Sequence, residues 1–316
     1  MFRESKQVSL VGATGRLHQA GRNRQAGIST QEVRDGAGCN RKLVRSCRSY
    51  SGNALTIQAV GTVVTVGGVL VLQGKIALVT GSSRGIGRAV ALGLAKAGAD
   101  VAVNCRDSSE EGARVVEEIR RLGSRSVLAM GDVLEPGEVK KVCEQVTREL
   151  GPVSILVNNA VYALQKPFLD IDPTEWLEQL HYKGFGYYLF CRELLPEMLR
   201  LGAGVIINVL STVAVRGGEG ESGYAASNGA ALALTRALAN EFGPSGVRCC
   251  ALMLTWAENA FDPMDPGCAR HTERFPLRRV TRLEEIAETA VFLASERAGA
   301  ITGSALVVDA GYLSQW

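Results

Sequence analysis

Along residues 72–316 of this chain, short apolar runs alternate with longer segments in which apolar residues recur every three or four positions. The short runs predict buried strands, and the three-to-four period predicts amphipathic helices. Glycine or proline stands at several of the junctions, where helices commonly start and stop. The expected strands are 75–79, 100–106, 126–130, 153–157, 205–210, 247–253 and 305–308, and the expected helices are 88–98, 109–122, 136–150, 173–200, 222–242 and 283–294.

This regular alternation, with short connections, predicts an α/β domain built on a doubly wound parallel sheet. Residues 255–281 show no period and are expected to be irregular. The pattern therefore defines a single folded domain at residues 72–316. An apolar content of 46% is sufficient for a core of that size.

Residues 1–71 show no sustained period, and we expect them to be a disordered leader. Residues 1–68 contain ten Lys and Arg against three acidic residues, whereas the other 248 residues contain 25 basic and 29 acidic side chains. The basic excess thus belongs to the leader. A folded part with an acidic excess does not indicate nucleic-acid binding.

Three interpretations of the leader stay open. An arginine-rich, acid-poor, serine-containing N-terminus is typical of an organellar transit peptide. Alternatively, the reading frame opens upstream of a natural start near Leu72, since no methionine lies between Met1 and Met130. Third, the nineteen mostly apolar residues Ala54–Leu72 approach the length of a membrane anchor. The protein is expected in the cytoplasm, or in an organellar stroma or matrix if the leader is a transit peptide.

The first expected strand runs directly into Thr80-Gly-Ser-Ser-Arg-Gly-Ile-Gly87, which is followed by a helix. Glycines allow the backbone to approach a pyrophosphate closely. The N-terminus of the helix offers unpaired N–H groups and a positive dipole to the same group. This unit predicts a nucleotide-binding site.

Five motifs together make the chain resemble the short-chain dehydrogenase/reductase family, and most closely its 3-oxoacyl-acyl-carrier-protein reductase members. The resemblance covers residues 72–313 and implies a Rossmann fold and an oxidoreductase. Its motifs are the loop Thr80–Gly87, the pair Asp132-Val133, the turn Asn158-Asn159-Ala160, the thirteen-residue interval between Ser211 and Tyr224, and the C-terminal segments 301–303 and 308–311.

The nicotinamide cofactor is expected to be NADPH. NAD enzymes place a carboxylate at the end of the second strand, where this chain has Cys105 followed by Arg106. Arg106 and Arg84 can together bind a 2′-phosphate. The resemblance implies that the cofactor-binding residues are Gly81, Ser83, Arg84, Gly85, Ile86, Gly87, Arg106, Asp132, Val133, Asn158 and Ala160.

The catalytic residues implied by the resemblance include one departure. In the family a serine orients the carbonyl oxygen, a tyrosine donates the proton, and a lysine four residues later lowers the pKa of that tyrosine. Ser211 and Tyr224 match the first two, but Asn228 stands at the lysine position. Without that charge we expect Tyr224 to stay protonated, which favours reduction over oxidation.

Lys183 offers a compensation for the lost charge. By the family's interval it stands where a supporting asparagine is usual, and it shares a helical stripe with Leu180 and Tyr187. Our hypothesis is an exchange in which Lys183 supplies the cation and Asn228 binds ribose or water. In the alternative, Lys183 extends outward into solvent.

The expected reaction is reduction of the carbonyl of a β-ketoacyl or polyketide-like substrate, either free or attached to a carrier protein or coenzyme A. Val161 stands where most members have glycine, which leaves an enoyl-thioester reductase open, and Asn228 leaves a non-catalytic NADPH-binding homologue open. Candidate pocket aromatics are Tyr162, Tyr182, Trp256 and Phe261. The resemblance implies a homotetramer formed through helices 173–200 and 222–242. The eight cysteines and three histidines show no metal-ligand spacing.

Overall fold

The computed structural model describes residues 49–51, 54–59, 62–67, 71–260 and 272–315. The chain divides into two compact units, residues 1–68 and 69–316, and each is considered by itself.

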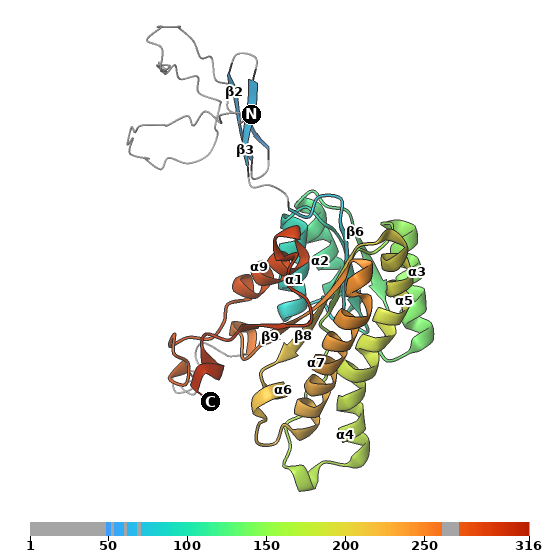
Figure 1. The fold of residues 1–316 in the computed structure, drawn as a ribbon, viewed down its shortest axis with the longest axis vertical. Helices are drawn as coiled ribbons and strands as arrows, with labels where there is room; N and C mark the ends of the chain where they lie inside the picture. The colour runs from blue at the N-terminus through green and yellow to red at the C-terminus, as the bar shows by residue number, and fades with distance from the viewer. Residues whose placement is uncertain (1–48, 52–53, 60–61, 68–70, 261–271, 316) are drawn as a thin grey trace. The chain divides into compact units, whose positions relative to one another are not determined.

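The larger unit is built on a seven-stranded sheet in which every strand is parallel to its neighbours (Figure 1). β4 lies inside the sheet between β7 and β5, and the chain moves outward from it first in one direction and then in the other. This reversal is the signature of a doubly wound sheet. In spatial order the strands are β10 (Ala305–Val308), β9 (Val247–Leu254), β8 (Gly204–Ser211), β7 (Ile155–Asn158), β4 (Ile76–Val79), β5 (Asp100–Cys105) and β6 (Ser126–Met130).

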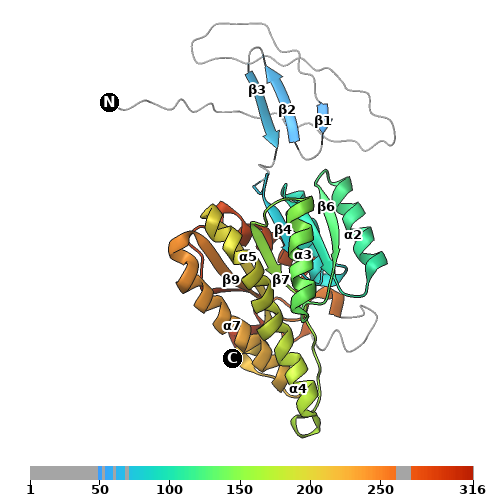
Figure 2. The same cartoon turned by 90° about the vertical axis from the view of Figure 1, so that its right-hand side faces the viewer.

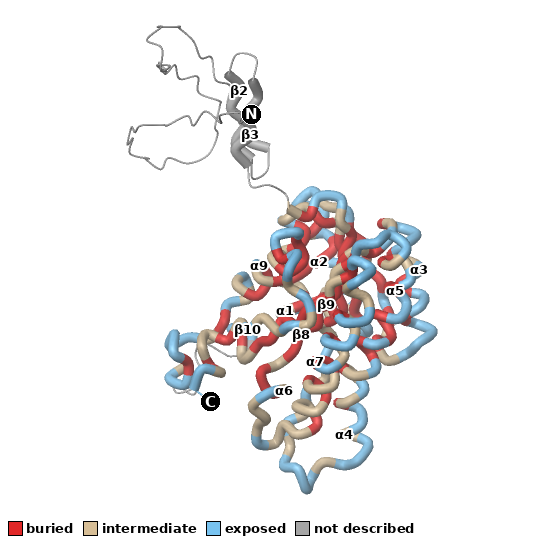
Figure 3. Tube along the Cα trace, viewed as in Figure 1, coloured by how far each residue is buried: buried red, intermediate tan, exposed pale blue. Residues whose placement is uncertain are grey.

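Helices cover both faces of the sheet (Figure 2). Alternate residues of β4 face opposite layers: Ala77 and Val79 pack with one set of helices, while Ile76 and Leu78 pack with the other. The sheet is therefore buried on both sides, and its strands form the buried centre of the trace in Figure 3. One layer contains α1 (Gly85–Lys96), α2 (Ser109–Arg121) and α9 (Leu283–Ala294), and the other contains α3 (Pro136–Glu149), α5 (Tyr187–Leu201) and α7 (Ser222–Phe242).

The expected single helix over 173–200 is divided into three parts in the structure. α4 (Pro173–Leu180) begins with a capping box formed by Asp172 and Glu175. The π-helical turn η2 (His181–Gly186) follows, and α5 continues the helix from it. The apolar spacing could not reveal this interruption, because Leu180, Lys183 and Tyr187 follow one another at the usual steps of three and four residues. π turns within helices are often found at functional sites.

Other boundaries differ from expectation by smaller amounts. α1 begins at Gly85, three residues before the expected start, because the last glycines of the loop already form its first turn. The short helix α6 (Val213–Arg216) was not expected. Short 3-10 segments are η1 (Phe168–Asp170), η3 (Gly243–Ser245), η4 (Glu258–Ala260), η5 (Glu296–Ala298) and η6 (Tyr312–Gln315).

The smaller unit contains a three-stranded antiparallel sheet, although no stable element was expected there. Its strands are β1 (Ser49–Ser51), β2 (Ala54–Ala59) and β3 (Thr62–Gly67), with Ile57 opposite Val64. The high proportion of Val, Thr and Ile explains the strands. The proposed anchor 54–72 thus forms strands over much of its length, and within the described chain no helix is long and apolar enough to cross a membrane. The remainder of the expected leader, residues 1–48, lies outside the described residues.

Candidate active site and cofactor cleft

Two adjoining cavities open at the carboxyl edge of the parallel sheet, the edge at which ligands bind in open α/β folds. The first has a volume of about 570 Å³ and lies against the glycine loop; we call it the cofactor cleft. The second, of about 350 Å³, lies at the ends of β8 and β9, and we call it the catalytic cavity. Ile86, Asn159 and Val161 line both, so the two form a continuous site.

The glycine loop is fixed tightly against the end of β7. Gly81 has φ +61°, and a Cβ there would lie 2.9 Å from the Ala160 Cα. A Cβ on Gly87 would meet the Gly81 carbonyl oxygen and would lie 2.6 Å from Asn159 Nδ2. The backbone N–H groups of Asn159 and Ala160 both donate to Thr80 Oγ1, at 2.9 and 3.0 Å. These positions therefore require glycine for a cradle at the N-terminus of α1.

The structure corrects the position of one expected cofactor residue, Asn158. Its side chain is fully buried, with Nδ2 donating to Asn208 Oδ1 at 2.9 Å, and it lines neither cavity. The neighbouring Asn159 faces the site instead, and its Nδ2 donates to the carbonyl oxygens of Thr80 and Gly81, both at 3.0 Å. Successive residues of a strand face opposite sides, so one of the two asparagines faces the cavities and the other faces away from them.

All of the other expected cofactor residues line the cofactor cleft. Cys105 and Ser108 also contribute, and the Ser108 and Ser83 hydroxyls lie 2.8 Å apart. Burial raises the pKa of the Cys105 thiol, so this side chain is neutral and presents no charge to a ligand. The remaining expected residues found in this lining are Gly81, Arg84, Gly85, Ile86, Gly87, Arg106, Asp132, Val133 and Ala160.

The two arginines of the cofactor cleft differ in their contacts. The Arg106 guanidinium donates to Asp107 Oδ2 at 2.7 Å, to the Tyr182 hydroxyl at 3.1 Å and to Asp132 Oδ2 at 3.4 Å. These acceptors, Asp107 first, raise its pKa further, so Arg106 is always charged. Arg84 is exposed at the N-cap of α1. Asp107 was not among the expected site residues. Tyr182 was expected as an aromatic of the substrate pocket, and the structure places it in the cofactor cleft. Its bond to Arg106 could not be predicted, because the two residues lie 76 positions apart and no local pattern links them.

Ser211 and Tyr224 meet in the catalytic cavity, as their interval implied. Ser211 ends β8, and its Oγ accepts a hydrogen bond from the Val213 N–H at 3.3 Å. Tyr224 lies in the first turn of α7. Burial raises the pKa of Tyr224, while hydrogen bonds from the side chains of Asn228 and Ser211 act in the opposite direction. The phenol is therefore protonated at neutral pH.

Asn228 is fully buried and does not line the catalytic cavity. Its Oδ1 accepts a hydrogen bond from the Ser211 backbone N–H at 2.7 Å, and its Nδ2 donates to the Tyr224 carbonyl oxygen at 2.8 Å. The expectation that Asn228 binds ribose or water is not met, because both ends of its amide already join the end of β8 to α7. It acts instead by holding the backbones of Ser211 and Tyr224 together.

Lys183 lies in the π turn η2 and is 2% exposed, so the alternative of an outward side chain is wrong. Its Nζ donates to the Val209 carbonyl oxygen at 2.6 Å and to the Tyr187 hydroxyl at 3.3 Å. The same Nζ lies 5.9 Å from the centre of the Tyr224 ring. Burial lowers the pKa of Lys183 to about 7, since removing an ammonium from water disfavours the charged form.

The outer wall of the catalytic cavity is more polar than the sequence indicated. Arg216 of α6 and Glu221 form an ion pair at 3.3 Å, with side chains 13% and 18% exposed. Burial raises the pKa of Glu221. The Arg216 guanidinium lies 5.3 Å from the centre of the Tyr312 ring, which stacks edge-on with Trp256. Trp256 lines the cavity, whereas Tyr162 does not and Phe261 lies outside the described residues.

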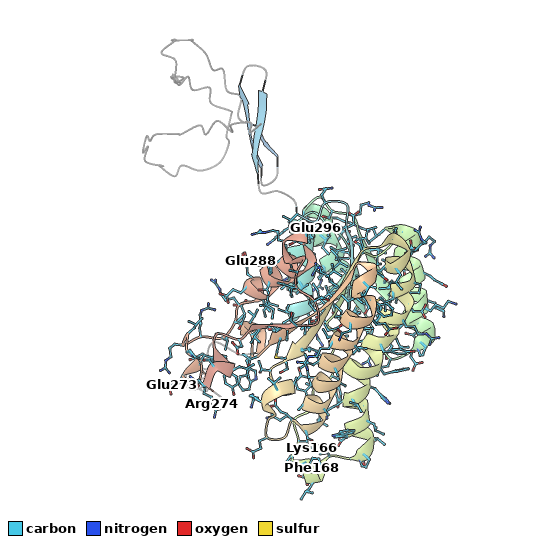
Figure 4. All side chains as sticks on the ribbon, in the orientation of Figure 1. Lys166, Phe168, Glu273, Arg274, Glu288 and Glu296 are labelled. Carbon is cyan, nitrogen blue, oxygen red and sulfur yellow. The ribbon has the colours of Figure 1, made fainter. Side chains whose placement is uncertain are left out.

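The loop after Ala160 forms one rim of the catalytic cavity. Leu164 and Gln165 line it, and the Leu164 N–H donates to Gln179 Oε1 of α4 at 3.1 Å. Lys166, labelled in Figure 4, forms an ion pair with Glu175 at 2.8 Å, and its backbone N–H donates to the Gly220 carbonyl oxygen at 2.9 Å. The rim is thus joined both to α4 and to the segment that carries the Arg216–Glu221 pair.

Comparison with known proteins agrees with this site. Residues 81–313 match a family model described as enoyl-(acyl carrier protein) reductase. The chain is 35% identical, over 241 residues, to the 3-oxoacyl-[acyl-carrier-protein] reductase FabG of Staphylococcus epidermidis, an alignment that covers 75% of this chain and 98% of the relative. It is also 35% identical to an L-rhamnose 1-dehydrogenase (NAD(P)(+)) of Sphingomonas, over 76% of this chain and 96% of that protein.

A solved structure shares the fold at comparable coverage. The gluconate 5-dehydrogenase of Burkholderia cenocepacia, determined with NADP and tartrate, superposes with a TM-score of 0.73 at 29% identity. The superposition covers 78% of this chain and 98% of that structure.

The parallel sheet with its glycine cradle, together with the Ser211–Tyr224 pair, defines an oxidoreductase of the Rossmann type that uses a nicotinamide cofactor. The chain belongs to the short-chain dehydrogenase/reductase family. Within this family it is similar both to FabG and, at the same identity, to the L-rhamnose 1-dehydrogenase.

Proposed function

We propose that this protein is an NADPH-dependent reductase that converts a carbonyl group to an alcohol. The observation that carries the proposal is the position of Ser211 and Tyr224 in a cavity that is continuous with the glycine cradle. A cofactor held by the cradle would reach Tyr224 through the shared wall formed by Ile86, Asn159 and Val161. A substrate carbonyl beside Tyr224 would then lie next to the reactive end of that cofactor.

The residues present fit a phosphorylated dinucleotide. The cradle has no room for side chains on its own glycines: a Cβ on Gly81 or Gly87 would collide with Ala160 or with the Gly81 carbonyl oxygen, and Gly85 has φ +55°. Arg84 and Arg106 supply positive charge, and the neutral Cys105 thiol does not repel a 2′-phosphate. The gluconate 5-dehydrogenase structure that shares this fold was determined with NADP, which supports the same choice.

When bound, NADPH supplies the hydride, and the residues of this chain supply the proton and the alignment. The Tyr224 hydroxyl is protonated at neutral pH and can donate to the oxygen of the substrate. The Ser211 hydroxyl lines the same cavity and can hold that oxygen in position. A tyrosine with a raised pKa is a poor base, so the reaction should be faster toward the alcohol than away from it.

For the substrate we propose a β-ketoacyl or related carbonyl compound, which is either free or attached to a carrier protein or coenzyme A. The similarity to FabG supports the acyl choice. Hydroxylated carbonyl compounds belong in the same test, because the relatives include sugar and gluconate dehydrogenases and the cavity wall carries Arg216 and Glu221. We further propose a homotetramer, on the basis of the family resemblance.

Two observations favour other functions. Val161 lines both cavities, where it adds bulk beside the cofactor, and the matching family model is described as an enoyl reductase. Asn228 brings no charge to the site, which favours a protein that binds NADPH without turnover. These are the enoyl-thioester reductase and the non-catalytic homologue.

One experiment separates the three functions. Purified protein is titrated with NADPH and with NADH, and is then incubated with NADPH and a panel of β-ketoacyl thioesters, enoyl thioesters and hydroxyketones. We expect tighter binding of NADPH and oxidation of NADPH with ketones alone. Oxidation with enoyl thioesters alone would indicate the second function, and binding without oxidation would indicate the third.

A further inference from the structure

Lys183 is a buried amine whose surroundings contain no carboxylate partner among the described residues. Val209 on β8 contributes a carbonyl oxygen, and Tyr187 on α5 contributes a hydroxyl. Tyr224 on α7 presents its ring. Burial is the single cause that lowers the pKa of Lys183, so no counter-charge in this part of the chain offsets it. A lysine kept in such a position without a counter-charge is costly and requires an explanation.

The π turn explains how Lys183 reaches this position. Gly186 in the same turn packs closely on the loop after β6, where a Cβ would lie 3.2 Å from the Val133 carbonyl oxygen. The pairing of β7 with β8 ends at Asn158 and Asn208. The next carbonyl of β8, that of Val209, accepts hydrogen bonds from both Lys183 and the Tyr187 hydroxyl. The amine is therefore held between the end of β8 and α7, beside Tyr224.

We propose that Lys183 is the cation that supports Tyr224 during reduction and that its loss of a proton switches this support off. The inference rests on the proposed function. As Tyr224 gives its proton to the substrate oxygen, a negative charge develops on the phenol. An ammonium beside the ring stabilises that charge, whereas a neutral amine does not. Lys183 acts through Tyr224 and is a positioning residue.

The titratable groups that face this pair come from several elements. Tyr187 on α5 and Tyr224 on α7 both have raised pKa values and stay protonated in the relevant range. Cys191 on α5 lies near Tyr187, and burial raises its pKa to about 12. Glu221, at the N-cap of α7, raises the pKa of Tyr224 and is already paired with Arg216. Lys183, with a pKa lowered to about 7 by burial, changes charge near neutral pH.

The test is the pH profile of hydride transfer to a ketone, measured in single turnover for the wild type and three variants. For the wild type we expect a rate that is constant below about pH 7 and falls about tenfold per pH unit above it, down to a residual rate. Lys183→Met should show that residual rate at every pH with an unchanged KM for NADPH. Lys183→Arg keeps its positive charge across this pH range. Its rate should therefore stay at the value of the wild type below pH 7 and should not decrease at higher pH. Tyr187→Phe removes one hydrogen bond of Lys183 but leaves the amine in place, so its rate should still decrease above about pH 7.

A second measurement does not depend on turnover. In protein labelled with ¹³C at lysine Cε, the signal that Lys183→Met removes should titrate with a midpoint near pH 7. A midpoint above about 9 would overturn the inference even in an active enzyme. Turnover with the same pH profile in Lys183→Met would overturn it as well. A wild type that reduces no ketone at all would contradict the proposed function, and the role of Lys183 with it.

Discussion

At the scale of single residues, a lysine and an asparagine side chain have exchanged places in the site. Asn228 occupies the place of a lysine but is directed to the backbones of Ser211 and Tyr224, and Lys183 brings an amine to Tyr224 from a different element. The sequence could predict the loss of charge at Asn228. It could not predict where the amide points, since the hydrogen bond to Ser211 spans seventeen residues.

Asn228→Ala should destabilise the protein. The change leaves the Ser211 N–H without its acceptor, which typically costs about 1–3 kcal/mol, whereas the Tyr224 carbonyl oxygen keeps its helical bond within α7. Urea unfolding followed by circular dichroism measures this. Asn240→Ala is the matched control, since Asn240 makes a similar bond to the Arg236 carbonyl oxygen on the exposed face of α7. A loss at Asn228 no larger than at Asn240 would refute the bridging role.

Arg106→Gln should weaken NADPH binding and leave NADH binding nearly unchanged. The guanidinium would otherwise pair with the 2′-phosphate, a group that NADH lacks. Asp107→Asn should strengthen NADPH binding and leave NADH binding nearly unchanged, because it frees Arg106 from the carboxylate acceptor at 2.7 Å. Fluorescence titration with each cofactor gives the two dissociation constants and their ratio. An equal loss of affinity for both cofactors in Arg106→Gln would mean that Arg106 does not bind the 2′-phosphate.

At the scale of elements, the apolar pattern was sufficient to predict the strands and most helices. The strands are buried on both faces and form continuous apolar runs, whereas the helices bury one face and show the three-to-four period. The π turn could not be predicted, since Lys183 already lies on the inward face by the ordinary helical spacing and nothing in that spacing marks the turn. The sequence also could not tell which of Asn158 and Asn159 faces the cavities, since a shift of one residue reverses the face of a strand.

The turn between β4 and α1 gives a test of the cradle. Gly87→Ala should abolish NADPH binding, because the new Cβ would collide with the Gly81 carbonyl oxygen and with Asn159 Nδ2. Gly137→Ala in α3 is the control: no atom lies within 4 Å of its Cβ, and alanine is the better helix former. Calorimetric titration compares the two. Retained binding in a folded Gly87→Ala protein would show that the cradle does not hold the cofactor.

At the scale of the whole molecule, the burial of Lys183 should make the free energy of unfolding depend on pH. Its pKa is lowered from 10.5 to about 7 in the folded protein, so between these values the unfolded chain binds a proton that the folded chain does not. The free energy of unfolding should therefore rise with pH, by up to about 1.4 kcal/mol per pH unit. Below about pH 7 both states carry the proton and this contribution is constant.

The comparison of variants isolates this effect. Between pH 7.5 and 9, wild type should gain stability relative to Lys183→Met, which has no titrating group at that position. Lys141→Met, at an exposed position of α3, should keep the pH dependence of the wild type. Urea unfolding at a series of pH values supplies the differences. Parallel curves for wild type and Lys183→Met would show that Lys183 is not buried as described.

Carbonyl reduction by this site is tested most directly by tracing the hydride of NADPH into the product. NADPH that carries deuterium at the transferring position of the nicotinamide is incubated with the protein and a β-ketoacyl thioester, and the product is analysed by mass spectrometry. We predict one deuterium on the carbon that bears the new hydroxyl, and a rate about 100-fold or more lower in Tyr224→Phe, which keeps the ring but loses the proton donor. Deuterium at a reduced double bond, or none in any product, would contradict carbonyl reduction by this site.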